Sequence, residues 1–266
     1  MTEPHLPKDH FARGDAYEPY VGRWSRLVAR EFIEWLNMPK GKAWLDVGCG
    51  TGALTQTILQ HAEPLKVKGV DRSEGFIEYA SARVQDERAE FEVGDAQSIA
   101  VEDNSYDIAV SGLVLNFVPK PEVMITEMAR AAREKVAIYV WDYGEGMQMM
   151  RYFWDAAAAL EPDAARLDEG PRFVICQPEP LTKLFETAGL QDVQVRPIDV
   201  PTVFKDFDDY WGPFLGGQGP APTYAMSLNE EQRAALRERL RTSLPIASDG
   251  SISLTARAWA VKGTKI

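Results

Sequence analysis

Residues 45–52, with the sequence LDVGCGTG, combine one carboxylate with three closely spaced glycines. Apolar residues precede the glycines and a helical pattern follows them, so we expect a buried strand, a tight turn and then a helix. Glycines let the backbone approach a ligand closely because no Cβ intervenes, and a helix N-terminus offers free N–H groups. Parallel sheets bind ligands at the carboxyl ends of their strands. The pattern therefore predicts a small-molecule site built from Asp46, Gly48, Gly50 and Gly52.

The glycines also satisfy a pattern of dinucleotide-binding proteins, because Gly48, Gly50 and Ala53 fit G-x-G-x-x-A. Asp46, two residues before the first glycine, distinguishes the two ligand classes. A carboxylate would repel a pyrophosphate, whereas it suits a ligand that carries an ammonium or a sulfonium. An NAD(P)-dependent oxidoreductase stays as an alternative, although no Tyr-x-x-x-Lys pair or suitably placed histidine supports it.

Strands and helices are predicted to alternate through the first half of the chain, which indicates a parallel sheet with right-handed crossovers. The expected strands are 43–47, 67–70, 91–93, 106–110 and 136–141, and the expected helices are 22–36, 53–61, 74–86 and 121–133. A helix at 181–188 and strands at 193–200 and 254–261 are expected further on. The segment of about fifty residues between these last two strands is too long for a plain connection, so we expect a cap or lid there. Within it, 216–222 is expected to be a flexible loop, and Ser227 to Glu230 a capping box that opens a helix.

Four sequence elements, in order, resemble the class I S-adenosylmethionine-dependent methyltransferases that act on small molecules. They are D-x-G-C-G-T-G at 46–52, Asp71 at the end of the second strand, Gly94-Asp95-Ala96 after the third, and Tyr106 to Ser111 on the fourth. The resemblance implies an α/β fold with a Rossmann-like parallel sheet of about seven strands, closed by an antiparallel hairpin. It also implies helices on both faces of the sheet and a helical cap.

The resemblance assigns roles to the matching residues. Asp46 and the glycine turn would face the methionine part of S-adenosylmethionine, and Asp71 would accept hydrogen bonds from the two ribose hydroxyls. Asp95 would accept from the adenine amino group. The other cofactor-binding residues that it implies are Arg72, Ala96 beside a ring nitrogen, Ser111 through its backbone, and Tyr20 or Arg23 over the methionine carboxylate.

Together with this resemblance, the sequence leads us to expect four parts within one structural domain. Residues 1–40 form an N-terminal arm and cap helix, and 41–143 form the cofactor-binding core. Residues 144–178 form a cap insertion. Residues 179–266 supply the rest of the core, with a second cap or lid insertion at about 202–251.

The expected reaction is methyl transfer from S-adenosylmethionine to a small organic acceptor by in-line displacement, with S-adenosylhomocysteine as the product. A base is needed only if the acceptor must lose a proton. Residues 115–121 read LNFVPKP, so they keep the prolines but lack the histidines of the family pattern L-H-H-x-P-x-P. Residues 111–118 also resemble the quinone-precursor C-methyltransferases, which carry an asparagine near this point. The candidates for acceptor chemistry are Asn116, Asp142 and Tyr143. A non-catalytic S-adenosylmethionine-binding protein is a further alternative.

The composition limits which classes of partner we expect for this chain. The 40 acidic and 29 basic residues give a net charge of −11, which disfavours binding to nucleic acid. No apolar run is long enough to span a membrane, and the first residues show no apolar segment of a secretory signal. The 2 cysteines and 3 histidines show no disulfide framework and no zinc-ligand spacing. We therefore expect a cytoplasmic enzyme with a small-molecule acceptor, no metal and no membrane partner.

Overall fold

The structure is a computed structural model that describes residues 22–216 and 219–266. Its centre is a seven-stranded sheet with the order β3-β2-β1-β4-β5-β7-β6. The strands are β1 (Ala43–Val47), β2 (Lys66–Asp71), β3 (Ala89–Val93), β4 (Tyr106–Gly112), β5 (Ala132–Trp141), β6 (Gln191–Phe204) and β7 (Ile252–Thr264). The first five pair in parallel, and β7 runs antiparallel between β5 and β6. The predicted Rossmann-like sheet with a terminal antiparallel hairpin is confirmed.

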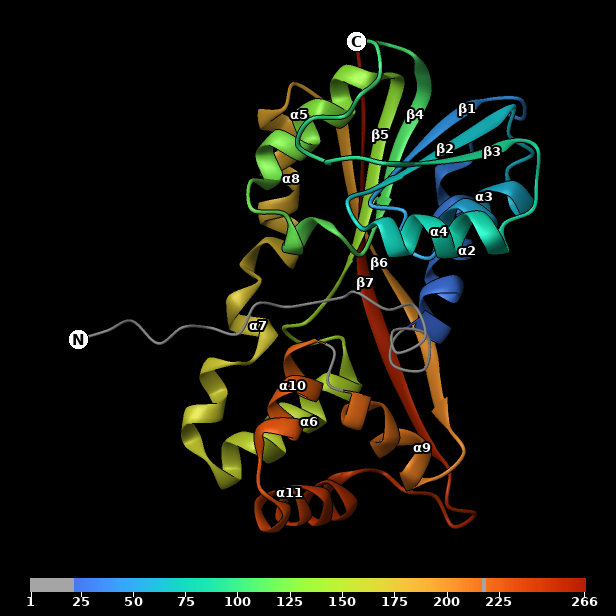
Figure 1. Cartoon of the computed structure of the whole chain (residues 1–266). Coiled ribbons are helices and arrows are strands. Elements are labelled where there is room, and N and C mark those ends of the chain that lie inside the picture. Colours follow the sequence, from blue (N-terminus) through green and yellow to red (C-terminus); the bar gives the residue numbers. More distant parts are fainter. Residues whose placement is uncertain (1–21, 217–218) are drawn as a thin grey trace.

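Helices cover both faces of this sheet (Figure 1). On one side lie α2 (Arg23–Leu36), α3 (Ala53–His61) and α4 (Glu74–Arg83), and on the other lie α5 (Pro121–Ala131) and α8 (Pro178–Thr187). All five residues of β1 are buried, which explains its uninterrupted apolar character apart from Asp46. Two expected helices end early: α4 ends at Arg83, and α5 ends at Ala131 because Ala132 already belongs to β5.

The last two strands are longer than the sequence predicts. β5 pairs with only the C-terminal part of β7, from Ala258 onward, so the remaining residues of β6 and β7 form a two-stranded ribbon beyond the sheet. Pro197 and Pro201 are tolerated in β6 because it is an edge strand. Alternate residues from Ile198 to Phe204 are buried, so one face of the ribbon packs against the helical cap.

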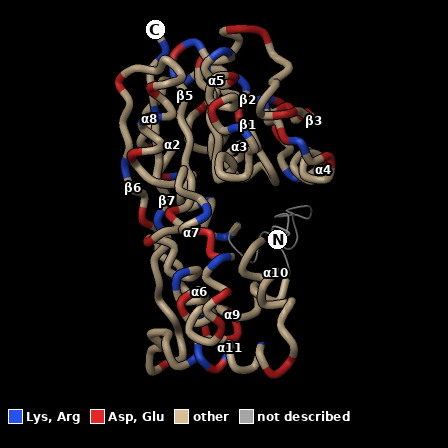
Figure 2. Tube along the Cα trace, turned by 90° about the vertical axis from the view of Figure 1, so that its left-hand side faces the viewer, with Lys and Arg blue, Asp and Glu red and all other residues tan. Residues whose placement is uncertain are grey.

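The cap is built from α6 (Gln148–Leu160), η3 (Pro162–Arg166), α7 (Glu169–Arg172), η4 (Val174–Cys176), α9 (Phe207–Trp211), η5 (Gly212–Gly216), α10 (Pro220–Ser227) and α11 (Glu230–Ser243). A short η2 (Leu115–Phe117) follows β4 in the core. Figure 2 shows the core and the cap stacked one above the other, joined along one edge by β6 and β7, with α4 and α10 on the opposite side. A ligand between the two parts would therefore contact both.

Two details of the cap differ from expectation. Residues 220–222 begin α10 rather than continuing a loop, because Pro220 occupies the first turn, where a missing N–H costs nothing. The capping box that opens α11 uses Asn229 and Gln232, not Ser227 and Glu230. The Ser227 hydroxyl instead donates to the Tyr224 carbonyl oxygen at the end of α10.

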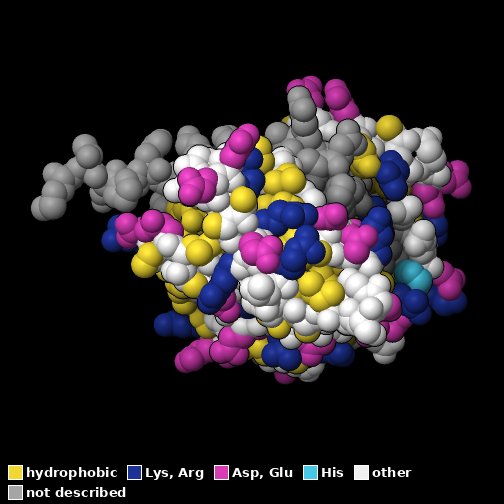
Figure 3. All heavy atoms as spheres, turned by 90° about the horizontal axis from the view of Figure 1, so that it is seen from below, with side chains coloured by type: hydrophobic (Ala, Val, Ile, Leu, Met, Phe, Trp, Pro, Cys, Tyr) yellow, Lys and Arg dark blue, Asp and Glu magenta, His cyan; other side chains and the backbone are white. Residues whose placement is uncertain are grey.

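The arginines of α11 hold the cap together. Arg237 pairs with Asp208 at 2.7 Å, Arg241 stacks on the Phe207 ring at 4.1 Å, and Arg233 donates to the Ala225 carbonyl oxygen at the end of α10. Acidic, basic and apolar side chains are interleaved on the underside of the molecule (Figure 3). Throughout 22–216 and 219–266, no helix is both long and apolar enough to cross a membrane.

Candidate active site

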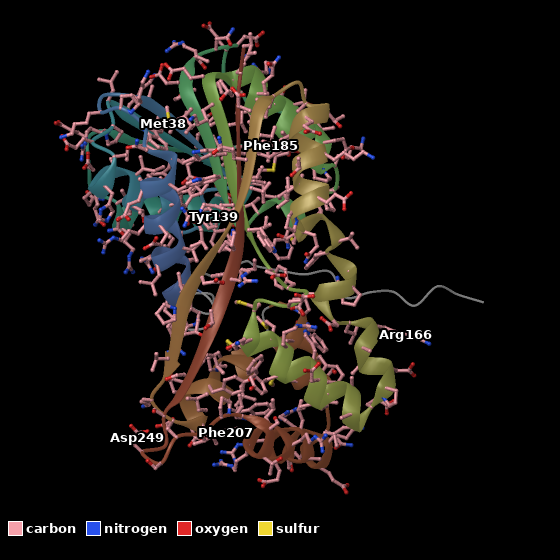
Figure 4. The ribbon with its side chains drawn as sticks, turned by 180° about the vertical axis from the view of Figure 1, so that it is seen from behind. Met38, Tyr139, Arg166, Phe185, Phe207 and Asp249 are labelled. Carbon is pink, nitrogen blue, oxygen red and sulfur yellow. The ribbon has the colours of Figure 1, made fainter. Side chains whose placement is uncertain are left out.

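A cavity of about 290 Å³ opens between the carboxyl ends of the parallel strands and the cap. One half is lined by the glycine turn after β1 and by the ends of β2 and β3. The other half is lined by the ends of β4 and β5 and by cap residues from α6, α7 and α10. Tyr139, on the wall of this second half, lies where the sheet meets the ribbon, far from Phe207 and Asp249 at the tip of the cap (Figure 4).

The glycine turn needs its glycines. Gly48, Gly50 and Gly52 all have positive φ angles, of 74°, 52° and 82°. A Cβ on Gly48 would lie 2.6 Å from Val114 Cγ2, so the turn packs tightly against the loop after β4. A Cβ on Gly50 would meet no described heavy atom within 4 Å, although Gly50 lines the cavity. The missing Cβ at Gly50 therefore leaves space for a ligand, whereas the missing Cβ at Gly48 lets the Val114 side chain pack against the turn.

Asp71 connects the turn to the end of β2. Its Oδ2 accepts a hydrogen bond from the Gly50 backbone N–H at 3.0 Å, and its Oδ1 accepts from the Ser73 N–H at 2.9 Å. Burial raises the pKa of this carboxyl, and the two backbone N–H groups oppose that shift. Each oxygen keeps a second lone pair for a ligand hydroxyl. Asp71 thus fixes the turn and presents two acceptors to the cavity.

Asp46 lies at the cavity floor with no exposed surface. Its Oδ2 accepts from the Thr55 hydroxyl at 2.7 Å, while its Oδ1 has no partner among the described residues. Burial raises its pKa to about 7, and the neighbouring charge of Asp71 adds to this effect. A buried carboxylate with one open oxygen fits a ligand ammonium, which would both pair with it and lower its pKa.

We expect Asp46→Asn to separate stability from ligand binding. Because the folded pKa of Asp46 lies above its unfolded value, the native protein holds this proton more tightly, and stability is lost as the pH rises toward 7. At pH 8 the variant should therefore melt roughly 2 to 4 °C above the parent, for about 1 kcal/mol of relieved burial cost. Its affinity for S-adenosylhomocysteine should fall at pH 8, and it should lack the rise of affinity with pH that we expect in the parent.

Thermal unfolding and calorimetric titration between pH 5 and pH 8 test this. Glu169 titrates in the same range in both proteins, so the difference between parent and variant isolates Asp46. A variant that melts below the parent at pH 8, or that binds equally well there, would contradict the assignment.

The adenine end of the predicted site also lies on the cavity. Asp95, Ala96 and Arg72 all line it. Asp95 is exposed, and its Oδ1 accepts from the backbone N–H of Gln97 at 2.8 Å, which holds the turn after β3 in place.

Three predicted cofactor residues, Gly52, Ser111 and Arg23, are not among the residues that line this cavity. A Cβ on Gly52 would lie 3.1 Å from Val84 Cγ2 and 3.3 Å from Ala80 Cβ, so this glycine allows close packing within the protein rather than contact with a ligand. Ser111 is buried in β4, and the next residue, Gly112, lines the cavity instead. Arg23 pairs with Asp209 at 3.0 Å and stacks on the Trp24 ring at 4.3 Å, so it joins α2 to α9. Tyr20 lies outside the described residues.

Of the three candidates for acceptor chemistry, one lies on the cavity wall and two do not. Tyr143 lines the cavity. Asp142 is buried, but its Oδ1 accepts from the Glu145 N–H and the Gln177 side chain, both at 3.2 Å, so it organises the turn after β5. Asn116 lies in η2 beside the cavity wall, and its amide atoms are buried without a partner among the described residues.

The sequence missed the residues that the loop after β4 and the cap add to the cavity. Leu113 lines it with a positive φ of 64°, a conformation that no pattern of residue types predicts for leucine. Met150, Glu169 and Pro220 reach it from three different cap helices. These three lie far along the chain from any strand end, so only the folded cap reveals them.

Fold and site together define an α/β protein with its ligand cavity at the carboxyl ends of a Rossmann-like sheet. A family model described as "Methyltransferase domain" matches residues 45–140. The chain is 28% identical to demethylmenaquinone methyltransferase of Bacillus licheniformis over 62% of this chain and 77% of that one. It is 27% identical to 2-methyl-6-phytyl-1,4-hydroquinone methyltransferase of Synechocystis, over 82% of this chain and 66% of that one.

Among solved structures, phosphoethanolamine N-methyltransferase 2 of Haemonchus contortus, bound to phosphomonomethylethanolamine and S-adenosylhomocysteine, has the same fold. The TM-score is 0.58 at 17% identity, covering 94% of this chain and 56% of that one. The family model over residues 45–140, the methyltransferase relatives and the shared fold support a class I S-adenosylmethionine-dependent methyltransferase, as the sequence motifs predicted. The family model and these relatives are methyltransferases, so neither the oxidoreductase nor the non-catalytic alternative is supported.

Proposed function

We propose that this cavity transfers the methyl group of S-adenosylmethionine to a small, organic acceptor that enters between the sheet and the cap. The observation that carries the proposal is the row of three acids, Asp46, Asp71 and Asp95, along one half of a single cavity. When bound, S-adenosylmethionine supplies an electrophilic methyl group on a sulfonium. The chain has to bind it, orient the acceptor in line with it and exclude water.

Each acid suits one part of the cofactor. Asp46 would pair with the methionine ammonium through its open Oδ1, and Asp71 would accept from the ribose hydroxyls. Asp95 and the Ala96 N–H would meet the adenine edge. The relatives from Bacillus licheniformis and Synechocystis are named for quinone or hydroquinone substrates, which supports a small ring compound as the acceptor.

The net charge and the two cysteines bear on the type of acceptor and on the cellular compartment. The net charge of −11 supports a small molecule over nucleic acid as the acceptor. Cys49 and Cys176 are both free and buried, which suits a reducing cytoplasm.

Titration with S-adenosylhomocysteine and with 5′-methylthioadenosine, which lacks the amino-acid part, tests the assigned roles. In the parent, the full ligand should bind more tightly. Asp46→Asn should remove most of this difference, because it removes the partner of the ammonium, while leaving 5′-methylthioadenosine nearly unchanged. Asp46→Asn weakening both ligands equally would contradict the role of Asp46.

Turnover is tested with trideuteromethyl S-adenosylmethionine and a set of hydroxylated ring compounds, with products analysed by mass spectrometry. The proposal expects a product heavier by the labelled methyl group, formed together with S-adenosylhomocysteine. Omission of either substrate is the control.

A further inference from the structure

The half of the cavity that faces the cap differs in chemistry from the half that contains Asp46, Asp71 and Asp95, which we call the cofactor half. The walls of the cap-facing half are mainly apolar and aromatic, and the residues that matter here are Phe117, Trp141, Tyr143, Met150 and Pro220. Tyr143 and Phe117 each contact the Phe173 ring, with centroids 5.3 and 5.5 Å apart, so the three rings form a packed row. We refer to these walls as the acceptor half. A flat, apolar ring fits such a surface.

Glu169 is the one carboxylate on the described wall of the acceptor half. It begins α7 and is 1% exposed. Its Oε2 accepts a hydrogen bond from the Trp154 indole N–H. Burial raises its pKa to about 7, so a substantial fraction is ionised at neutral pH. Burial of an ionised carboxylate costs free energy unless the group is paired, and such groups are common at functional sites.

The charged neighbours of Glu169 are already paired with one another. Arg151 of α6 donates to both carboxylate oxygens of Asp168, the residue before Glu169. Asp168 also accepts from the Gly170 N–H at 2.8 Å and so caps α7. Within the described part of the chain, Glu169 has no ion pair of its own. Its carboxylate accepts from the Trp154 indole and from its own backbone N–H, and its remaining lone pairs can accept from a ligand.

The charges around the cavity restrict the acceptor. Arg72 is the one basic side chain on the cavity wall among residues 22–216 and 219–266, and it lies at the end of β2 beside Asp71. An anionic acceptor would thus meet Glu169 with no described counter-charge in its half of the cavity. A cationic acceptor would have to approach the positive sulfonium of the methyl donor. A neutral acceptor avoids both costs.

We propose that Glu169 binds the methyl acceptor, and that the acceptor is an uncharged aromatic molecule with a hydroxyl group that donates a hydrogen bond to this carboxylate. The inference rests on the proposed function. It names the class of the acceptor and assigns to Glu169 its recognition, which the sequence did not indicate. The aromatic walls hold the ring, and Glu169 fixes the position of the hydroxyl.

The test uses the full chain saturated with S-adenosylhomocysteine and three probes of similar shape: 2-naphthol, 2-methoxynaphthalene and 2-naphthoate. Binding is followed by calorimetry and by the fluorescence of tryptophan, since Trp141 lines the cavity. The parent should bind 2-naphthol about tenfold more tightly than 2-methoxynaphthalene, because only the naphthol donates a hydrogen bond to a charged acceptor. The anionic 2-naphthoate should bind least.

Glu169→Gln keeps the shape of the side chain and an oxygen for the Trp154 indole. It should weaken 2-naphthol about tenfold, leave 2-methoxynaphthalene within about threefold, and leave S-adenosylhomocysteine binding unchanged. Asp163→Asn is the matched control, because Asp163 lies in the neighbouring η3 with a largely exposed side chain. It should change none of these affinities.

The outcomes separate the two claims. Failure of the parent to bind S-adenosylhomocysteine would overturn the proposed function itself. If S-adenosylhomocysteine binds normally, three results would overturn this inference alone. They are equal binding of 2-naphthol and 2-methoxynaphthalene, binding of neither, or tightest binding of 2-naphthoate. The comparison of the three probes on the parent decides the matter even if Glu169→Gln fails to fold.

Discussion

Asp71→Ala should lower the affinity for S-adenosylhomocysteine by at least about a hundredfold, because hydrogen bonds to a charged carboxylate contribute about 1.5 to 3 kcal/mol each. The substitution removes the proposed partner of two ribose hydroxyls. It also removes the acceptor of the Gly50 and Ser73 N–H groups, so the glycine turn loses its anchor to β2. Calorimetric titration measures the effect directly.

Two further variants make this result specific. Asp71→Asn keeps one carbonyl oxygen and should fall between the parent and Asp71→Ala. Glu78→Ala, on the exposed face of the adjacent α4, should bind like the parent. Binding by Asp71→Ala within threefold of the parent would show that the ligand does not use this carboxylate.

Gly50→Ala should reduce S-adenosylhomocysteine affinity by more than about tenfold, because the new methyl group would occupy space in the cavity rather than strike the protein. Gly41 offers a matched comparison. Both glycines have positive φ angles, of 52° and 74°, and a Cβ on either would meet no described heavy atom within 4 Å. Gly41, however, lies in an exposed turn and is not among the residues on the cavity wall.

The two alanine variants should therefore lose similar stability, about 1 to 2 kcal/mol each, from a non-glycine residue in the left-handed region. Only Gly50→Ala should lose binding. Thermal unfolding and titration of both variants give the comparison. Equal affinities in Gly50→Ala and Gly41→Ala would mean that the ligand does not lie against the glycine turn.

The placement of Asp46, Asp71 and Asp95 on the cavity could be predicted from the sequence because these residues lie at or just after the ends of strands. Asp46 lies in β1, Asp71 ends β2 and Asp95 follows β3, and parallel strands bring their carboxyl ends to one edge. Strand periodicity and glycine spacing are local properties, so they can be read without the fold. The same reasoning predicted the parallel strands of the sheet, whereas the terminal hairpin was implied by the family resemblance.

The direction of individual side chains was harder to predict. The backbone of Ser111 was expected at the cofactor, yet the next residue along β4, Gly112, lines the cavity instead. Arg23 was expected over the cofactor, but Asp209, far along the chain, pairs with it. A partner so distant in sequence leaves no local signal.

Apart from Tyr143, the acceptor half could not be predicted from the sequence, because it depends on how far β6 and β7 extend. The sequence indicated strands at 193–200 and 254–261, whereas β6 runs from Gln191 to Phe204 and β7 from Ile252 to Thr264, so both extend past the sheet as the two-stranded ribbon. This ribbon joins the cap to the core beside the cavity and so brings Glu169 and Pro220 to its wall. Packing between distant segments, rather than any periodicity, sets these contacts.

Thermal unfolding with S-adenosylhomocysteine, compared with NAD⁺ at the same concentration, tests the central claim most directly. At about 100 times its dissociation constant, a ligand of the native state adds about 2.7 kcal/mol of stability, which raises the melting temperature by roughly 5 to 10 °C for a chain of this size. We expect this rise with S-adenosylhomocysteine, no rise with NAD⁺, and a much smaller rise in Asp71→Ala. No shift at millimolar S-adenosylhomocysteine, or an equal shift with NAD⁺, would contradict the assignment of this cavity to S-adenosylmethionine.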